Sequence, residues 1–544
     1  MYRRRVTPGA VHVLSLLVGF VVLLVVNRHQ WFTGDDWEFI TNRGVFHARR
    51  GLLEPHNEHW STVPILLFRF VLTVFGTRSY LPFLLPVLVA HLVVAHLLWR
   101  LLLRTQIAPW LATALAGSFV VIGAGAENLL WAFQIGFVAS VAFGLAAVYE
   151  LATGGVGPPT RRRLARVWIW TVLGLASSGV GLTWLVVVGL FALMSFGARA
   201  AAQVVVVPAL VYAAWFVPFG RAAAARDTNR VSSTTLPVVP EYVWTGLTHA
   251  LSSWVGIATS GGALALALLI VGLRLASDPR QNALPLAMAV GSVVFFLIGA
   301  YGRLGLGPDE AAVPRYAYIA IALLLPLAAR ALSLVTPSAG VIVPVVSAVI
   351  LTSTGLDQLV TRARDEADTE QRNRVKIVAA EHLIQNGDRL VDQFIEPTRN
   401  PDLSARALAS LMSHGDRFTG TYAAQGLLQE RLQTEVTVAS RGAGLPPLTT
   451  AGPPPAAGSC PLSHAGSDGT VVMFASGPGG GEADVAVRGV VFASFADATG
   501  RATTHKTLSF TTTDHVLVVT APEAKVTLLL SQDASNDCAR TGAP

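Results

Sequence analysis

Apolar segments long enough to cross a bilayer recur through the first 355 residues of the chain. A membrane-spanning helix needs about 20 mainly apolar residues, because each backbone polar group in hydrocarbon must be bonded within the helix. Read with that length, the sequence predicts about eleven spanning helices. The expected spans are 9–27, 80–101, 108–124, 129–149, 166–179, 181–197, 202–219, 254–274, 283–301, 316–334 and 339–355.

The composition excludes an ordinary soluble domain of this size. Of 544 residues, 52% are hydrophobic and only 13% are charged, and the mean hydropathy is +0.53. A polytopic α-helical membrane protein is predicted, with membrane lipid as a partner. The net charge of +7 does not require a nucleic-acid partner. Basic loops that face the cytoplasmic lipid surface account for it.

The distribution of arginine predicts which ends of the helices face the cytoplasm. Arg3, Arg4 and Arg5 precede the first span, which lacks a small-residue cleavage site, so we expect a retained helix and a cytoplasmic amino terminus in the plasma membrane. Alternation of sides then places ten further arginines in the cytoplasm. These are Arg100, Arg104, Arg161, Arg162, Arg163, Arg166, Arg199, Arg274, Arg280 and Arg330.

The least certain part of this pattern is 166–197, which is either one long tilted helix or two short helices. We expect two, broken at Ser177–Gly181, because only that parity keeps the later arginines inside. The loops 28–79, 220–253 and 302–315 are then extracytoplasmic. So is the chain after residue 356.

The carboxyl-terminal part differs in pattern from the membrane domain, 1–356. Residues 357–441 have helix-like spacing and mixed charge, and 442–459 form a Pro/Gly linker. Short β-branched runs separated by turn residues follow in 460–544. An extracytoplasmic α+β region that ends in a small β-sandwich is therefore predicted.

Cys460 and Cys538 bracket the β region and are the two cysteines of the chain. In an oxidising exterior they are expected to form one disulfide, which the chain-entropy model values at roughly 4 kcal/mol. Two free buried thiols are the alternative. No CxxC, zinc or haem motif is present.

The first expected external loop carries acidic residues directly after the first span, at Asp35, Asp36 and Glu38. Adjacent Asp35 and Asp36 diverge by about 100° in a helix, so one can face a cavity while the other caps the following helix. A helix cap is the structural alternative for either aspartate, since Asp after Thr-Gly is common there. Their position beside the membrane favours a functional role.

Farther along the same loop, His56, Glu58 and His59 lie within four residues. The two histidines are three apart and could ligate a metal with Glu58 or Asp36, but a lone H-x-x-H is a weak signal. A polar cluster that orients the loop or binds phosphate is favoured over metal binding. Simple interfacial anchoring is the third possibility.

Two other corners are expected to face the same compartment. Glu127 and Gln134 lie two turns apart at the start of one span, and Arg303, Arg315 and Tyr316 flank the entry to another. Arginine forks suit bidentate contact with phosphate, although snorkelling into headgroups is the alternative. Within the membrane, His91 and His96 are predicted to be packed, hydrogen-bonded histidines.

This layout resembles the GT-C superfamily of integral-membrane glycosyltransferases. The resemblance rests on Gly34-Asp35-Asp36 in the first loop, on Ser177-Ser178-Gly179 between paired short helices and on Arg315-Tyr316. More narrowly, Trp37-Glu38-Phe39, His56–Trp60 and Glu127–Gln134 are similar to uncharacterised actinobacterial members of that group. The resemblance covers about residues 9–355, and the tail is similar to the sugar-binding modules of some mycobacterial arabinosyltransferases.

The resemblance implies inverting transfer of a sugar from a polyprenyl-phosphate donor to a glycan or lipid acceptor of the cell envelope. It implies Asp36 as the general base, with Asp35 as second choice, and Arg303 or Arg315 at the donor phosphate. Further substrate-binding positions are Glu38, His56, Glu58, His59, Glu127, Gln134 and Tyr316. No cofactor is expected, and a divalent metal is possible but not indicated.

Two other classes of function stay open on the sequence. One is a non-catalytic scaffold for envelope assembly or carbohydrate binding, whose first-loop carboxylates would face protein. The other is a lipid or polysaccharide transporter, which would be expected to carry inverted repeats and mid-membrane charges. The sequence shows no evident repeat, and the spans as drawn contain no Asp, Glu or Lys.

Overall fold

A computed structural model describes the chain in two compact units. The helical unit comprises Met1–Gln30, Arg50–Val74 and Ser79–Asp368, and the second unit comprises Trp31–Arg49, Phe75–Arg78 and Thr369–Pro544. The described residues are 7–45, 50–105, 107–155, 157–226, 231–335, 342–385, 395, 399–400, 402–415 and 418, together with the backbone of nine strands after residue 436.

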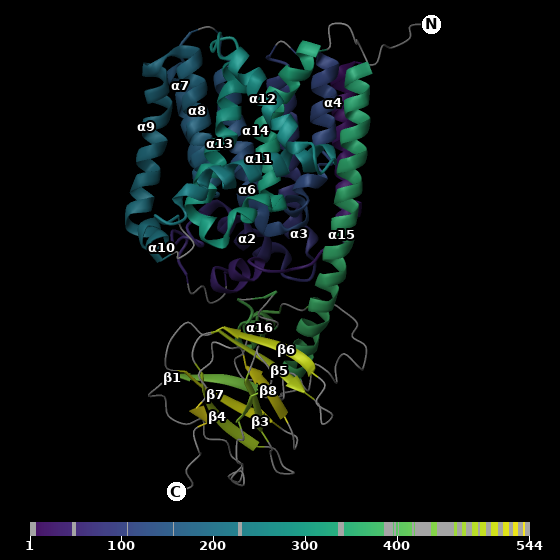
Figure 1. Cartoon of the computed structure of the whole chain (residues 1–544), viewed down its shortest axis with the longest axis vertical. Helices are drawn as coiled ribbons and strands as arrows, with labels where there is room; N and C mark the ends of the chain where they lie inside the picture. Colours follow the sequence, from purple (N-terminus) through teal and green to yellow (C-terminus); the bar gives the residue numbers. More distant parts are fainter. Residues whose placement is uncertain are drawn as a thin grey trace. The chain divides into compact units, whose positions relative to one another are not determined.

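Helices make up almost all of the described part of the helical unit (Figure 1). The first eight are α1 (Pro8–Val26), α2 (Thr62–Phe75), α3 (Leu81–Leu102), α4 (Pro109–Phe119), α5 (Glu127–Leu130), α6 (Ile135–Ala152), α7 (Arg161–Leu175) and α8 (Val180–Phe196). The next seven are α9 (Ala198–Trp215), α10 (Arg221–Arg226), α11 (Val239–Val255), α12 (Gly261–Leu275), α13 (Ala283–Arg303), α14 (Pro314–Val335) and α15 (Ile342–Gln385), which continues into the second unit.

Seven stretches among the described helices are long and apolar enough to cross a membrane, which makes this a multi-pass membrane protein. They are Pro8–His29, Leu81–Leu102, Ala132–Ala152, Ala198–Ala225, Ala283–Leu306, Pro314–Leu334 and Ile342–Val378. Each of the eleven expected ranges contains a helix. Eleven membrane crossings and the sidedness of the helix ends stay predictions.

Burial differs sharply between central and peripheral helices. The most apolar windows of Ala132–Ala152 and Pro314–Leu334 are 67% buried, whereas those of Pro8–His29 and Ile342–Val378 are 17% buried. The exposed face of α1 consists of apolar side chains such as Leu14, Leu17 and Val21. Such faces are what lipid contact requires, since hydrocarbon does not penalise exposed aliphatic groups.

The expected break near Ser177–Gly181 is confirmed. Helix α7 ends at Leu175, and α8 begins at Val180. A Cβ at Gly181 would lie 2.6 Å from backbone atoms of Gly174 and Leu175, so only glycine permits this close turn between two helices.

The expected external loop 220–253 is largely helical instead. Helix α11 buries Tyr242, Gly246 and Trp254 against its neighbours and ends at Gly256, which adopts a left-handed conformation (φ 76°). The sequence did not predict this helix, because only one of its faces is apolar and the segment as a whole has mixed polarity.

The buried histidines are packed and hydrogen-bonded, as predicted. His91 on α3 contacts the Tyr318 hydroxyl and the Val120 carbonyl oxygen, each at 3.0 Å. His96 Nδ1 lies 3.3 Å from His12 Nε2 on α1. Both histidines therefore hold helices together.

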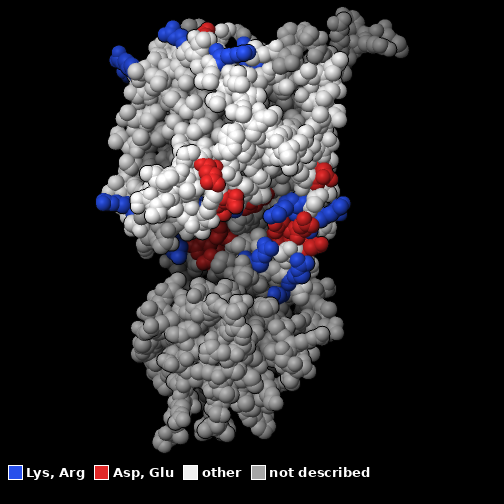
Figure 2. All heavy atoms as spheres, in the orientation of Figure 1, with Lys and Arg blue, Asp and Glu red and all other residues white. Residues whose placement is uncertain are grey.

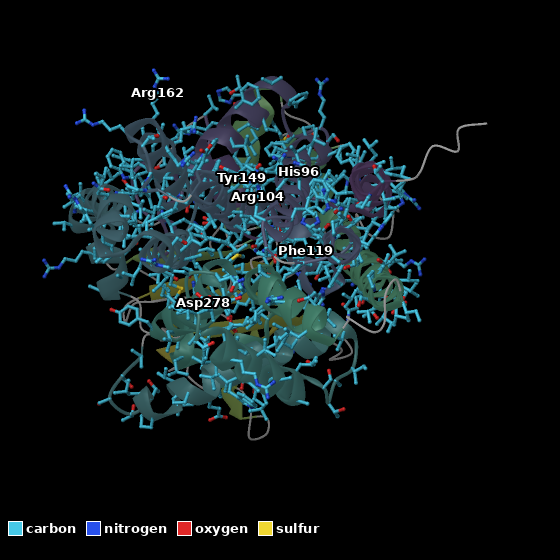
Figure 3. All side chains as sticks on the ribbon, turned by 90° about the horizontal axis from the view of Figure 1, so that it is seen from above. His96, Arg104, Phe119, Tyr149, Arg162 and Asp278 are labelled. Atoms are coloured by element: carbon cyan, nitrogen blue, oxygen red, sulfur yellow. The ribbon has the colours of Figure 1, made fainter. Side chains whose placement is uncertain are left out.

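At one end of the helical unit, the top in Figure 2, basic side chains lie with almost no acidic ones beside them, whereas the basic side chains lower in the same view lie among acidic ones. Arg161, Arg162 and Arg163 begin α7 there, and Arg166 pairs with Glu150 of α6 at 3.0 Å. Figure 3 views this end from above and shows Arg162 extending outward from the bundle. The clustering agrees with the expected arginine pattern without fixing which side of the membrane it faces.

The second unit joins the segment after α1 to the chain after residue 369. Glu370 accepts a hydrogen bond from the Trp31 amide at 2.6 Å, and Asn373 and Asn400 bond each other through their side chains. The rings of Trp31, Phe32, Trp37 and Phe418 pack edge to face or tilted. Helix α16 (Ala405–Ser413) is capped by the Ser404 hydroxyl.

Nine antiparallel strands follow in two sheets, ordered β1-β7-β4-β9 and β2-β3-β8-β5-β6. They are β1 (Thr437–Gly442), β2 (Leu462–His464), β3 (Thr470–Phe474), β4 (Gly481–Val487), β5 (Val490–Ala496), β6 (Ala502–Ser509), β7 (His515–Ala521), β8 (Val526–Leu530) and β9 (Asp537–Cys538). A sandwich of these sheets stays a prediction. The predicted disulfide involves Cys460, which lies outside the described residues, as does most of the predicted linker 442–459.

Candidate functional site

A tight turn in the loop before α2 presents Glu58. His56 and His59 bond each other through their backbones, N to O at 3.0 and 2.9 Å, and Asn57 between them has φ 51°. Asparagine is among the few residues that adopt this left-handed conformation readily. The sequence Pro55-His56-Asn57-Glu58-His59 is therefore built to project one carboxylate from a rigid turn.

The loop that carries this turn is fastened to α9. Trp60 stacks on Trp215 with ring centroids 5.3 Å apart and planes inclined by 6°. Trp215 Nε1 also donates to the Leu53 carbonyl oxygen at 2.8 Å. These contacts fix the position of Glu58 relative to the helices.

Glu58 forms an ion pair with Arg303 at the end of α13. Arg303 donates to a Glu58 oxygen at 2.9 Å, and each side chain is 26% exposed. His59 Nε2 lies 3.7 Å from the same oxygen. Burial by itself raises the pKa of Glu58, but His59 and Arg303 more than offset it, so that the pKa lies below the ordinary value.

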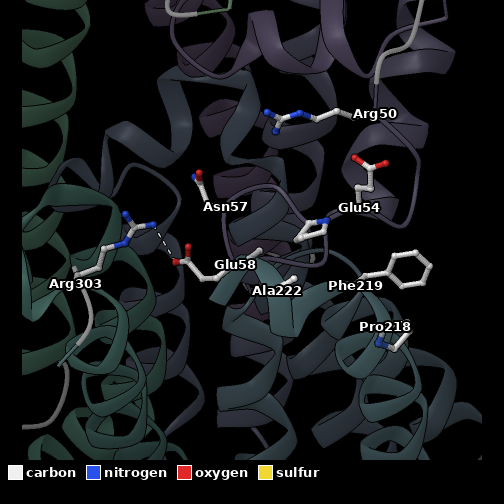
Figure 4. A pocket seen from close by; sticks show the side chains of 10 residues that line it. Arg50, Glu54, Asn57, Glu58, Pro218, Phe219, Ala222 and Arg303 are labelled. Atoms are coloured by element: carbon white, nitrogen blue, oxygen red, sulfur yellow. Dashed lines mark hydrogen bonds and ion pairs between the residues drawn. The ribbon is translucent and has the colours of Figure 1, made fainter. Parts of the chain in front are cut away.

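This ion pair borders two cavities. A cavity of about 650 Å³ with charged as well as apolar walls lies between the loop and the segment after α9, and its wall includes Arg50, Asn57 and Phe219 (Figure 4). In Figure 4 the side chains of Arg303 and Glu58 point toward each other, and the dashed line marks their ion pair. Phe219 belongs to a π-helical turn, Phe216–Gly220, a feature that often marks functional sites.

The second cavity, of about 170 Å³, is lined mainly by apolar and aromatic groups. Its walls come from α6, α8, α9, α13 and α14, which contribute Phe137, Val180, Tyr212, Phe296 and Tyr316. Glu58 and Arg303 line this cavity as well. The same charged pair thus lines both cavities.

His59 closes one side of the apolar cavity against the amino end of α8. A Cβ at Gly179 would lie 2.6 Å from His59 Nδ1, so glycine is required for the imidazole to approach this helix end. His56 turns elsewhere and packs against Phe133, with ring centroids 5.0 Å apart. The two histidines of the sequence motif therefore contact different helices.

Arg315 forms a separate cluster at the start of α14. Its two terminal nitrogens donate to Glu127 at 2.9 Å and to Glu310 at 3.0 Å, and its guanidinium lies over the Tyr316 ring at 5.2 Å. Gln134 does not join this cluster, because its side-chain oxygen accepts from Asn128 at 3.4 Å. Glu127 and Gln134 thus serve different neighbours.

Asp35, Asp36 and Glu38 belong to the second unit. Asp36 is fully buried, and its carboxylate accepts from the Thr33 amide at 3.2 Å, which is the backward bond of a capping box. Glu38 pairs with Arg43 at 2.9 Å, and both side chains are buried. Asp36 therefore caps the turn that begins at Thr33, and Glu38 holds Arg43.

Among the residues that the structure describes, no group of three or more His, Cys, Asp or Glu side chains could hold a metal ion. Several residues that line the cavities were not predicted from the sequence. Arg50, Thr183 and Tyr212 carry no motif, and the last two lie in apolar helices where a hydroxyl looks like ordinary packing.

No protein-family model matches the sequence, and no curated protein matches it. Among solved structures, the chain is similar to the crystal structure of ArnT from Cupriavidus metallidurans bound to undecaprenyl phosphate. The TM-score is 0.47 and the identity 15%, over 77% of this chain and 87% of that chain. This likeness describes two backbones and assigns no substrate to the present chain.

Proposed function

We propose that the protein is a membrane glycosyltransferase that moves a sugar from a polyprenyl-phosphate donor to an extracytoplasmic acceptor, a glycan or lipid of the cell envelope. One observation carries the proposal: the Glu58–Arg303 pair lines both a cavity with charged and apolar walls and a second, mainly apolar cavity. A substrate with a charged head and a hydrocarbon tail fits such a pair of cavities. The sequence resemblance to GT-C enzymes supports the same class.

The proposed reaction is a single displacement with inversion. A carboxylate takes the proton of the acceptor hydroxyl, whose oxygen forms the new bond to the anomeric carbon. The bond from that carbon to the phosphate oxygen breaks, and the lipid phosphate leaves with the electron pair. Arginine side chains stabilise the charge that develops on the phosphate.

Two carboxylates are proposed for the base. Asp36 is the base predicted from the sequence, with Asp35 as second choice, and Glu58 is supported by its place on the walls of both cavities. Loss of a general base lowers transfer by roughly 10²- to 10⁴-fold. A neutral amide of the same shape therefore separates a chemical role from a packing role.

The test is a transfer assay on the purified full chain in lipid bilayers, with polyprenyl-phosphate sugars as donors. The transfer rates of Asp36→Asn, Glu58→Gln and a matched control, Glu150→Gln, are compared. The thermal stability of each variant is measured in parallel, so that a loss of transfer is not a loss of folding. Glu150 pairs with Arg166 at the opposite, arginine-rich end of the helical unit, so its variant should retain full transfer.

A fall of about 10²-fold or more in one of the first two variants identifies the base. Undiminished transfer in both, and in the double variant, removes Asp36 and Glu58 as the base and leaves Asp35, which Asp35→Asn tests in the same assay. Absence of transfer by the unmodified chain with every donor would favour a non-catalytic assembly protein.

A further inference from the structure

The larger of the two cavities at the Glu58–Arg303 pair is big enough to hold a whole ligand. Its volume is about 650 Å³, within the roughly 300–1,000 Å³ of small-molecule sites, whereas the second cavity, at about 170 Å³, lies below that range. The proposed reaction needs an acceptor as well as a donor, and the acceptor hydroxyl has to reach a base. Glu58 lines the larger cavity, so a molecule held there meets this condition.

One wall of the larger cavity is apolar and comes from a single stretch of chain. It consists of Pro218 and Phe219, in the π-helical turn after α9, and of Ala222 and Ala223 in α10. Phe219 is half-buried, and among these small neighbours its ring is the largest apolar group of the wall. Such a wall offers a flat aromatic surface on which an apolar face of a ligand can stack.

The other wall of this cavity is polar. Arg50, Glu54 and Asn57 come from the loop before α2, and Glu58 and Arg303 complete the wall. In Figure 4 the three loop residues lie above the labelled residues of the apolar wall. Guanidinium groups only donate hydrogen bonds, carboxylates only accept them, and an amide does both. With two arginines and two glutamates, the formal charges of the wall cancel.

The backbone conformation of Asn57 presents its side chain at this polar wall. Among the residues that the structure describes, Asn57 is the non-glycine residue with a positive φ, 51°. The backbone bonds between His56 and His59 close the turn around it. Its side chain is exposed, and its amide makes no hydrogen bond to any described residue. A conformation that few residues adopt thus leaves one donor and one acceptor group available to a ligand.

We propose that the larger cavity binds an uncharged glycan, which is the acceptor of the transferred sugar. This inference rests on the proposed function, which leaves the acceptor open between a glycan and a lipid. A sugar ring has a face of C–H groups and a rim of hydroxyls. It can therefore stack on Phe219 while hydroxyls of its rim bond Asn57 and reach Glu58. Hydroxyls both donate and accept, which matches a wall that carries both kinds of group.

The cancelled charge of the polar wall is the reason for an uncharged ligand. An anionic glycan would bring its charge beside Glu54 and Glu58, and a cationic glycan would bring its charge beside Arg50 and Arg303. Like charges brought together in this way are costly and select against the wrong partner.

Binding of glycans to the full chain in lipid nanodiscs tests the proposal separately from transfer. The probes are uncharged linear trisaccharides of glucose, galactose, mannose and arabinose, with trigalacturonic acid as the anionic and triglucosamine as the cationic counterpart. Phe219→Ala removes the ring, and Asn57→Gly removes the amide while it retains the left-handed backbone. Phe70→Ala is the matched control, because Phe70 is 62% exposed on α2 and lines neither cavity. Thermal unfolding of each variant checks that the fold is retained.

We expect at least one uncharged trisaccharide to bind, and both charged ones to bind at least about 10-fold more weakly. Phe219→Ala should weaken the binding about 10-fold, because the apolar contact is lost, and Asn57→Gly about 2- to 10-fold, the range for a neutral hydrogen bond. Phe70→Ala should bind as the unmodified chain does. In the transfer assay, Phe219→Ala and Asn57→Gly should raise the KM of a glycan acceptor and leave the KM of the donor unchanged.

Other outcomes overturn the proposal. Absence of binding by every uncharged trisaccharide refutes it, as does binding that neither Phe219→Ala nor Asn57→Gly weakens. Tighter binding of trigalacturonic acid or triglucosamine contradicts the uncharged class. Transfer to a lipid acceptor without glycan binding refutes the glycan site and leaves the enzyme proposal intact. The expected binding without any transfer does the reverse, since it supports the glycan site and contradicts a glycosyltransferase.

Discussion

Glu58 is the side chain whose surroundings bear most on chemistry. It is partly buried, and its charge is stabilised by Arg303 at 2.9 Å and by His59 at 3.7 Å. A carboxylate held in this way is a weak base until its cation is taken by another anion.

The lowered pKa of Glu58 gives a prediction for the dependence of stability on pH. Because the folded pKa lies below the unfolded value of 4.5, the pair stabilises the fold fully above that value. The stabilisation is lost as the pH falls through the folded pKa. In Arg303→Gln, burial is left opposed by His59 and by a backbone hydrogen bond to the Glu58 carboxylate, so the pKa of Glu58 should rise and the loss should begin at higher pH.

Thermal unfolding of the unmodified chain, Arg303→Gln and Glu58→Gln against pH measures this effect. Glu58→Gln serves as the control that has no carboxylate to titrate. An Arg303→Gln profile that coincides with that of the unmodified chain would contradict the assignment of the pKa shift to this pair.

At the residue scale, the sequence predicted which residues belong to the site better than it predicted which residues they contact. It singled out Glu58, His59 and Arg303, and the structure brings these three together. It named Glu127 and Gln134 two turns apart on one span without their partners, and the structure pairs Glu127 with Arg315 from another helix. Such pairings depend on long-range packing, which local spacing does not encode.

At the scale of elements, the paired helices α7 and α8 are held by backbone contact. Gly181 allows α8 to approach Gly174 and Leu175 without a side chain between them. Gly181→Ala should destabilise the protein by about 1–3 kcal/mol, because backbone atoms cannot move aside as a side chain can. The cavity beside the amino end of α8 should be distorted as well.

Gly262→Ala is the matched control, since Gly262 also occupies the second position of an apolar helix. A Cβ there meets only a Trp244 ring atom at an ordinary 3.6 Å. We expect this variant to be neutral or slightly stabilised, by about 0.5–1 kcal/mol from helix propensity. Equal melting temperatures for the two variants would mean that the close approach is not required.

The sequence predicted elements well where a helix is apolar throughout and poorly where only one face is buried. The break between α7 and α8 follows from Ser177-Ser178-Gly179, whose residues favour turns. Helix α11 was missed, because Tyr242, Gly246 and Trp254 are spaced for one buried stripe within a mixed sequence.

At the scale of the whole molecule, the arginine pattern predicts an extracytoplasmic carboxyl-terminal region. A cysteine introduced by Thr450→Cys, with Cys460 and Cys538 changed to serine, should react with a membrane-impermeant maleimide in intact cells. Gly157→Cys in the same background, between α6 and α7 at the arginine-rich end, should react only after the membrane is opened. The opposite pattern would reverse the orientation of every loop.

The second unit has a consequence for the order of events on the ribosome. The segment after α1 finds its partners very late in the chain: Trp31 bonds Glu370, 339 positions away, and Thr41 bonds the Asp402 carbonyl oxygen, 361 positions away. At the usual 5–20 residues per second, that interval lasts about 20–70 s. Throughout it, Trp31, Phe32 and Trp37 have emerged without the later residues that cover them. During synthesis, the aromatic segment after α1 therefore has to be shielded by lipid headgroups or a chaperone until the residues that cover it have been made.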